Sequence, residues 1–175
     1  MTIRKIALAG VIGALYAALT LALGFIAYGP VQFRIAEALC ILPFFFPAAV
    51  PGLFVGCVIA NLLSPYGILD IVGGSSASLL AALFTMYLGR LNRDSLPVKA
   101  LACAPPVIVN ALVIGLVIAW TETSGGGAFW YAFLINGAWV GFGQLVVLYA
   151  IGLPMMVFLP KKRFFKSLLA QYHSM

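Results

Sequence analysis

The stretch YGPVQFRIAEAL, residues 28–39, places an amide, a guanidinium and a carboxylate between two long apolar runs. Gln32, Arg34 and Glu37 could bind a polar ligand, because the arginine donates hydrogen bonds and the carboxylate accepts them. A structural use is equally open, since Glu37 in the first turn of a predicted helix complements the helix dipole and can pair with Arg34. Only 8% of the chain is charged. Two opposite charges this close together are therefore the first candidates for function.

Other polar side chains lie in or beside apolar runs. Asp70 lies where a predicted helix begins, so it could bind a ligand or serve as an N-cap. Glu122 follows a predicted helix and could bind a ligand or simply be solvated. Asn110, Asn136 and Gln144 lie well inside apolar runs, where an unpaired amide costs several kcal/mol. These amides must either bond one another or line a cavity.

The last long apolar run carries candidates for a pocket wall. At 100° per residue, Asn136, Trp139 and Gln144 lie on a single arc of a helix. Amides beside an aromatic ring fit a pocket better than a lipid-facing surface. Trp130 and Tyr131, near the start of the run, could belong to an interfacial aromatic belt or could stack on a flat ligand.

Several classes of chemistry are missing from the sequence. It contains no GxxxxGK[ST], HExxH or GxSxG motif, and its single histidine, His173, lies in the C-terminal tail. Cys40, Cys57 and Cys103 lie far apart within apolar runs and form no CxxC pair, which indicates buried small side chains. We therefore expect no enzyme activity, no metal site and no cofactor.

The composition indicates which elements must position these side chains. Apolar residues make up 64% of the 175 residues, and the mean hydropathy is +1.13. A chain of this size could not hide so much apolar surface in its own core, so the sequence predicts an integral membrane protein. The net charge of +6 then reflects basic loops rather than a nucleic-acid partner. The first apolar run is longer than the ~7–15 residues of a signal-peptide core, which predicts a retained span.

Basic clusters decide the predicted topology. Arg4/Lys5, Arg90/Arg93/Lys99 and Lys161/Lys162/Arg163/Lys166 all fall on the cytoplasmic side only if the proline-rich region 35–63 contains two spans. We therefore predict an all-α protein with six transmembrane helices, both termini in the cytoplasm and residues 28–34 in an outer loop. The single transmembrane domain, residues 1–175, has predicted helices at about 6–27, 35–50, 52–63, 68–88, 98–120 and 129–159, followed by a basic cytoplasmic tail at 160–175.

Small residues recur every four positions in the first predicted span, and they form two adjacent rows. Helices approach closely over small residues in lipid, where packing rather than hydrophobicity drives association. This double row could dock another protein or could pack against helices of the same chain. The rows are Ala9, Gly13 and Ala17, and Gly10, Ala14 and Ala18.

Taken together, the six predicted spans, the alanine-rich face of the first helix and the outward polar loops resemble the S components of energy-coupling factor (ECF) transporters. VQFRIAEALCILPFF, residues 31–45, looks like the segment typical of the QueT group, which is linked to queuosine precursors. The resemblance implies a multi-pass protein of the bacterial plasma membrane that captures a small molecule from outside. A membrane scaffold subunit and two cytoplasmic ATPases would supply the energy.

The resemblance also implies roles for the candidate residues. The substrate would be a 7-deazaguanine such as preQ1 or queuine, with Glu37 accepting from it and Arg34 orienting Glu37 or reaching the ring oxygen. Asp70 and Glu122 are further candidate carboxylates, amides would read the ring edges, and an aromatic residue would stack. The amides are Asn110, Asn136 and Gln144, with Gln32 beside Arg34; the aromatics are Trp130, Tyr131 and Trp139; the scaffold-docking face is Ala9, Gly10, Gly13, Ala14, Ala17 and Ala18. Two alternatives stay open: an S component for thiamin or riboflavin, and a membrane assembly protein without transport activity.

Overall fold

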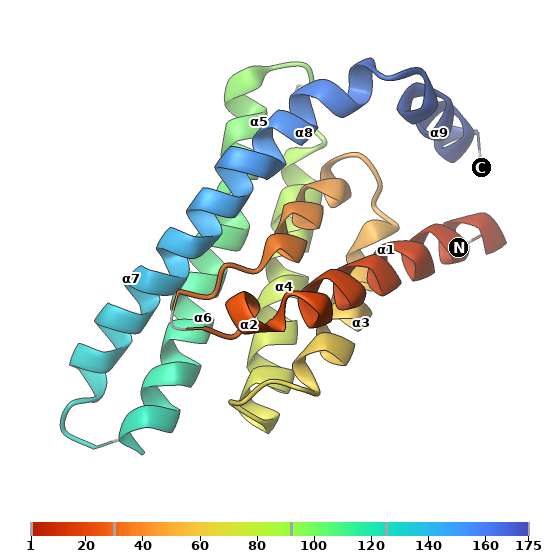
Figure 1. Cartoon of the computed structure of the whole chain (residues 1–175). Helices are drawn as coiled ribbons and strands as arrows, with labels where there is room; N and C mark the ends of the chain where they lie inside the picture. The colour runs from red at the N-terminus through yellow and green to blue at the C-terminus, as the bar shows by residue number, and fades with distance from the viewer. Residues whose placement is uncertain (1, 30, 92, 125, 175) are drawn as a thin grey trace.

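The computed structural model describes residues 2–29, 31–91, 93–124 and 126–174, and within these ranges the chain is helical without strands (Figure 1). The predicted all-α class is confirmed in this part of the chain. The elements are α1 (Ile3–Ala22), α2 (Gly24–Ala27), the 3₁₀ helix η1 (Ile35–Phe44), α3 (Ala49–Asn61), α4 (Ile68–Leu88), α5 (Leu96–Ala102), α6 (Ala104–Thr123), α7 (Phe129–Val147), the π-helical turn η2 (Leu148–Gly152), α8 (Leu153–Phe158), the 3₁₀ turn η3 (Leu159–Lys161) and α9 (Arg163–His173).

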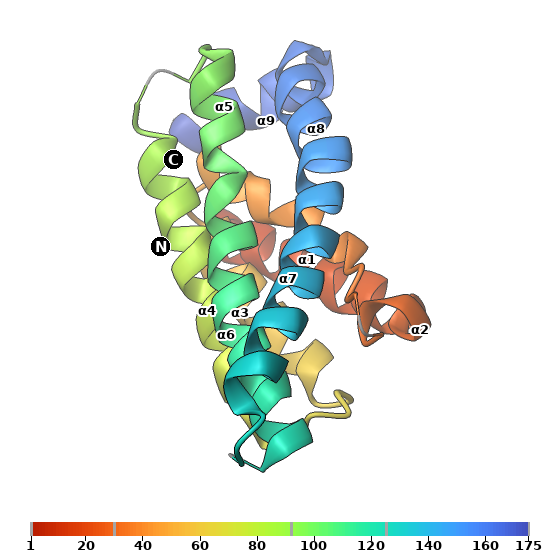
Figure 2. The same ribbon diagram turned by 90° about the vertical axis from the view of Figure 1, so that its left-hand side faces the viewer.

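Four helical stretches of the described chain are long and apolar enough to cross a membrane. They are Ile3–Ala22, Ile68–Leu88, Leu96–Thr123 and Phe129–Lys161, whereas Ile35–Phe44 and Ala49–Asn61 are shorter apolar helices. The predicted helix at 68–88 has the bounds of α4. In Figures 1 and 2, α4, α6 and α7 run alongside one another while α1 crosses them obliquely. Six spans and cytoplasmic termini remain predictions.

The breaks between helices differ from the predicted ones, and prolines explain much of the difference. The break in the region 35–63 lies at residues 45–48 rather than at Pro51. Pro51 instead lies in the first turn of α3, where a missing backbone N–H costs no helical bond. Two prolines at the start of α6 separate it from α5 at Cys103, and the π-helical turn η2 precedes Pro154. The predicted tail at 160–175 contains α9.

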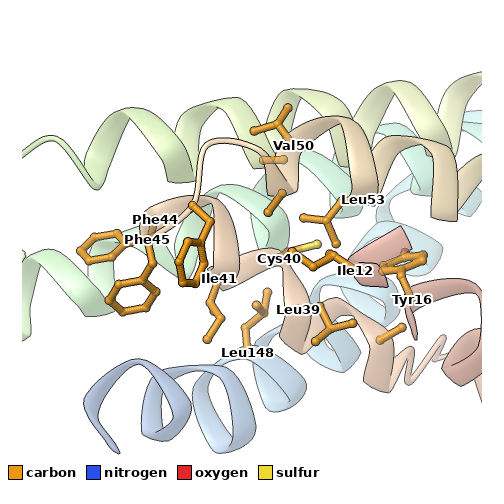
Figure 3. Packing of buried hydrophobic residues seen from close by; sticks show 14 of the residues in the cluster. Ile12, Tyr16, Leu39, Cys40, Ile41, Phe44, Phe45, Val50, Leu53 and Leu148 are labelled. Atoms are coloured by element: carbon orange, nitrogen blue, oxygen red, sulfur yellow. The ribbon is translucent and has the colours of Figure 1, made fainter. Parts of the chain in front are cut away.

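The core is centred on η1, a 3₁₀ helix of ten residues, which is long for this helix type. Ile41 and Phe44 of η1 are fully buried, and the next segment adds Phe46 at 1% exposure. Leu148 packs toward Ile41 from the chain beyond α7, as Figure 3 shows. A short helix that is apolar on nearly every side must be surrounded by other helices, and η1 is.

Close contact between α1 and α3 divides the two small-residue rows. A Cβ at Gly52 would overlap the carbonyl of Ala9, and one at Gly13 would lie 2.6 Å from the carbonyl oxygen of Gly52. Ala9, Gly13 and Ala17 are accordingly buried against the rest of the chain. The second row, Gly10, Ala14 and Ala18, remains exposed. The first row is thus used inside the chain, and only the second is free for another protein.

Gly52→Ala should destabilise the protein, because its new methyl group must push α1 and α3 apart. Overpacking of this kind costs about 1–3 kcal/mol of unfolding free energy. The matched control is Gly10→Ala, where nothing lies within 4 Å of the added Cβ. Chemical unfolding in detergent should separate the two variants, and equal stabilities would contradict the close α1–α3 contact.

Candidate functional site

Residues 31–34 carry two polar side chains into the interior of the helical bundle. Gln32 and Arg34 are 2% and 3% exposed, and a Cβ at Gly143 of α7 would overlap the carbonyl of Val31. In Figure 1 the chain between α2 and η1 lies beside the middle of α6 and α7, above the end where α6 meets α7. Irregular backbone at such depth is tolerated where protein surrounds it. The loop therefore brings its polar side chains into the interior.

Glu37 is held firmly by two donors. The Tyr16 hydroxyl of α1 donates to Glu37 Oε1 at 2.6 Å, and the Cys40 thiol donates to Oε2 at 3.0 Å. The first distance is typical of a hydroxyl bound to a carboxylate. Both Glu37 and Tyr16 are almost fully buried. These bonds fix the direction of the Glu37 carboxylate and connect α1 to η1.

Arg34 and Asp70 form a much looser pair. Arg34 Nη2 lies 3.8 Å from Asp70 Oδ2, and Nη1 donates to Asn61 Oδ1 at a long 3.3 Å. The guanidinium also lies 5.5 Å from the ring centre of Tyr28. Asn61 donates to the backbone carbonyl of Asp70 at 2.9 Å, not to its carboxylate. The Asp70 side chain is thus fully buried without firm partners.

Several buried polar atoms lack a hydrogen-bond partner within the described residues. Buried polar groups are normally bonded, and an unsatisfied one costs about 1–3 kcal/mol, so each needs an explanation. A bound polar ligand or ordered water would supply the partners of these atoms. The atoms are Nε2 of Gln32, both carboxylate oxygens of Asp70, Nε and Nη2 of Arg34, Oγ of Ser75, Nδ2 of Asn110 and Oε1 of Gln144.

These atoms come from elements that face one another. Asn110 of α6 lies one turn before Ile114. A Cβ built at Gly74 would meet Ile114, Asn61 and the Asp70 carboxylate. Gln144 follows Gly143, the residue against which the backbone of residues 31–32 packs. Asp70 and Asn61 thus lie beside Ile114, one turn from Asn110, and Gln144 lies next to the residue that packs on residues 31–32. We call these buried donors and acceptors of α4, α6, α7 and residues 31–37 the polar cluster.

The polar cluster carries excess negative charge. Arg34, Glu37 and Asp70 are the charged side chains that are buried in the described part of the chain. One guanidinium against two carboxylates leaves one formal negative charge. Because an uncompensated charge in a low-dielectric interior is costly, this region favours a partner that is positively charged.

The remaining predicted site residues lie elsewhere. Asn136 donates to Glu122 at 2.8 Å on the molecular surface. Trp130, Tyr131 and Trp139 are 69%, 72% and 50% exposed. Trp139 contacts Phe142, which in turn contacts Phe33 beside the polar cluster. The exposure of Trp130 and Tyr131, near the start of α7, accords with an interfacial belt, the alternative that the sequence left open for these two residues.

The sequence reasoning missed Tyr16 and Asn61, which are central to the polar cluster. Asn61 is an amide within a short apolar helix, so the cost argument applied to Asn110 and Gln144 would have found it. Tyr16 lies among small residues and gave no separate signal. Cys57, expected to be a plain buried thiol, accepts from Ser78 at 3.2 Å and from Asn61 at 3.4 Å.

Tyr16→Phe should lower the unfolding free energy by about 1.5–3 kcal/mol, because it removes a buried hydrogen bond to a charged group. Tyr28→Phe is the matched control, since the Tyr28 hydroxyl donates to the neutral carbonyl of Ala60. Its loss should cost only about 0.5–1.5 kcal/mol. Unfolding of both variants in detergent tests the difference, and a larger effect for Tyr28→Phe would contradict the role of Glu37.

The similarity of this chain to known proteins identifies its family. A queuosine precursor transporter QueT from Lactococcus lactis is 36% identical over 86 residues, which cover 48% of this chain and 51% of the relative. The match thus spans about half the length of that curated relative. No solved structure matches the chain. The sequence model of the QueT transporter family matches residues 6–161. With its apolar helices, the protein is a multi-pass protein of the bacterial plasma membrane, and it belongs to the QueT transporter family.

Proposed function

We propose that this protein is the substrate-binding S component of an ECF-type importer and that it captures a cationic 7-deazaguanine. The relative from Lactococcus lactis is named as a queuosine precursor transporter. The observation that carries the proposal for this chain is the polar cluster, with its unpartnered atoms and its excess negative charge. Substrates of the preQ1 type match both properties.

The chemistry of preQ1 complements the inventory of the polar cluster. Its ring offers N1–H and a 2-amino group as donors and O6 as an acceptor, and its aminomethyl arm is an ammonium. Arg34 and Asn110 have free donors for O6, while Gln144 has a free acceptor for the ring edge. Asp70 has two free acceptor oxygens for the ammonium. Ligand binding would then satisfy groups that are costly to leave buried and unbonded.

The carboxylates of Glu37 and Asp70 have different roles in this proposal. Glu37 is already held by Tyr16 and Cys40, so it orients the neighbouring residues and offers its remaining lone pairs. Asp70 is held only by the loose contact with Arg34 at 3.8 Å, so a ligand can displace this contact at little cost. This assignment gives the ammonium to Asp70 rather than to Glu37.

Entry of the substrate requires part of the chain to move, because the cluster is closed from solvent. Residues 31–34 are the candidate gate, since Gln32 has a φ of 48°, a left-handed conformation in which a non-glycine residue is strained. The segment is thus held by its contacts rather than by its own backbone preference. A non-transport assembly protein would have no need of such a region, because its buried polar groups would bond one another.

Asp70→Asn should weaken binding of the amine preQ1 by about 100-fold or more, since losing one partner of a buried charge pair costs about 2–5 kcal/mol. Binding of 7-cyano-7-deazaguanine, which is neutral at that arm, should be weaker in the parent protein and change less. Titration calorimetry on the purified chain measures both ligands.

Glu122→Gln, which alters a surface carboxylate, is the control and should bind like the parent. Binding of thiamin or riboflavin but of no 7-deazaguanine would overturn the substrate proposal.

The ECF part of the proposal concerns the exposed row Gly10, Ala14 and Ala18. Beside this row a groove of about 320 Å³ runs between α1 and α3 and is lined in part by Pro51, Val55 and Ile59. Small residues beside an apolar groove let a helix of a scaffold subunit approach closely. Energy would come from that subunit and two ATPases, because this chain has no phosphate-binding motif.

Ala14→Trp should abolish uptake in cells that contain the ECF subunits while leaving preQ1 binding intact. The indole would stand on the face where the scaffold helix must approach. Val72→Trp on α4 is the control, because Val72 is 63% exposed and lies outside the α1–α3 groove. Unchanged uptake by Ala14→Trp, or an equal loss in both variants, would place the docking face elsewhere.

A further inference from the structure

A second groove lies between α1, η1 and the C-terminal segment, away from the polar cluster. Its volume is about 500 Å³, and all its lining side chains except Lys162 are apolar. Phe164 at its rim is 79% exposed, whereas Phe46 and Phe165 are almost fully buried. The lining residues are Leu8, Ile12, Leu15, Leu42, Phe46, Leu159, Lys162, Phe164, Phe165 and Leu168.

The helix that closes this groove, α9, is fixed to the rest of the protein. The Phe165 ring contacts Phe45 and Phe46 with centroid distances of 5.3 and 5.4 Å. The backbone N–H of Ala48 donates to the Tyr172 hydroxyl at 3.0 Å, and Lys5 lies 4.9 Å from the centre of the Tyr172 ring. In Figure 1, α9 folds back toward the N-terminal end of α1. The groove is therefore a built feature of the fold.

Basic side chains are frequent in the segments that flank the groove. Lys161, Lys162, Arg163 and Lys166 are exposed, and residues 153–175 contain no acidic side chain. Arg4, also exposed, lies on the first turn of α1. Basic clusters at helix ends face the cytoplasm, and the cytoplasmic leaflet of a plasma membrane carries anionic lipids.

We propose that this groove binds one anionic phospholipid, with an acyl chain along its apolar walls and the phosphate at Lys162. The single cationic group in an apolar lining matches a molecule with one charged end and a long hydrocarbon tail. The proposal is independent of the substrate and of the ECF partners.

The experiment counts lipids bound to the purified chain by native mass spectrometry during titration with phosphatidylglycerol or phosphatidylcholine. Lys162→Gln should weaken phosphatidylglycerol binding about five-fold, the change that corresponds to ~1 kcal/mol for one cation near a lipid surface. Lys166→Gln removes the same charge from α9 outside the groove and should have little effect. Leu15→Trp should fill the groove and displace the lipid, whereas Leu21→Trp on the same helix should not, because Leu21 does not line the groove.

The parent protein is expected to prefer phosphatidylglycerol to phosphatidylcholine by at least five-fold. Equal binding of the two lipids would overturn the proposal, as would equal losses in Lys162→Gln and Lys166→Gln, since these results would indicate diffuse attraction. Retention of phosphatidylglycerol by Leu15→Trp would show that no acyl chain occupies the groove and would also overturn it. Circular dichroism of each variant confirms that it is folded before the titration.

Discussion

The burial of Arg34, Glu37 and Asp70 is the constraint on which the rest of the structure depends. Moving a charged group out of water costs several kcal/mol, and partners must offset that cost. Glu37 has such partners in Tyr16 and Cys40, so α1 and η1 are joined by bonds to one carboxylate. Asp70 has only a distant guanidinium. The helices thus hold the Glu37 carboxylate firmly and leave the Asp70 carboxylate without a close partner.

The approach of α1 to α3 makes this arrangement possible. Without side chains at Gly13, Gly52 and Gly56 the two backbones come into direct contact. That contact brings Tyr16 of α1 near Cys57 of α3, where their side chains lie 3.7 Å apart. The small residues, which look like a pure packing motif, therefore also set the position of the polar cluster. The exposed row Gly10, Ala14 and Ala18 of α1 lies next to the contact between α1 and α3. A change in the polar cluster and a change at this row would therefore act on the same pair of helices.

Much of this architecture could be predicted from the sequence, and the part that could not has physical causes. Hydropathy predicted α4 at 68–88 correctly, because a continuous apolar run of that length is typical of a single membrane-spanning helix. Counting basic clusters assigns loops to a side of the membrane but contains no information on depth. That count predicts an outer loop at residues 31–34, but it could not show that the backbone of residues 31–32 packs on Gly143. In α9 the apolar pairs Phe164/Phe165 and Leu168/Leu169 are separated by polar residues, which lowers the mean hydropathy of the helix and made it look like a plain tail.

The surroundings of α7 also explain why the predicted site residues lie in two separate places. Sequence spacing placed Asn136, Trp139 and Gln144 on one arc, and the helix does place them so, but its two ends have different neighbours. Gly137, beside Asn136, packs on Gly115 and Ala111 of α6, whereas Gly143, beside Gln144, packs on residues 31–32. Gln144 lies where residues 31–32 pack against α7 and is buried at 3% exposure, while Trp139, more than a turn earlier, is half exposed. A shared helical face is thus a necessary condition for a shared site, and contact with a second element is what completes it. In this protein the buried segment around Arg34 is that second element, and amides within its reach join the polar cluster.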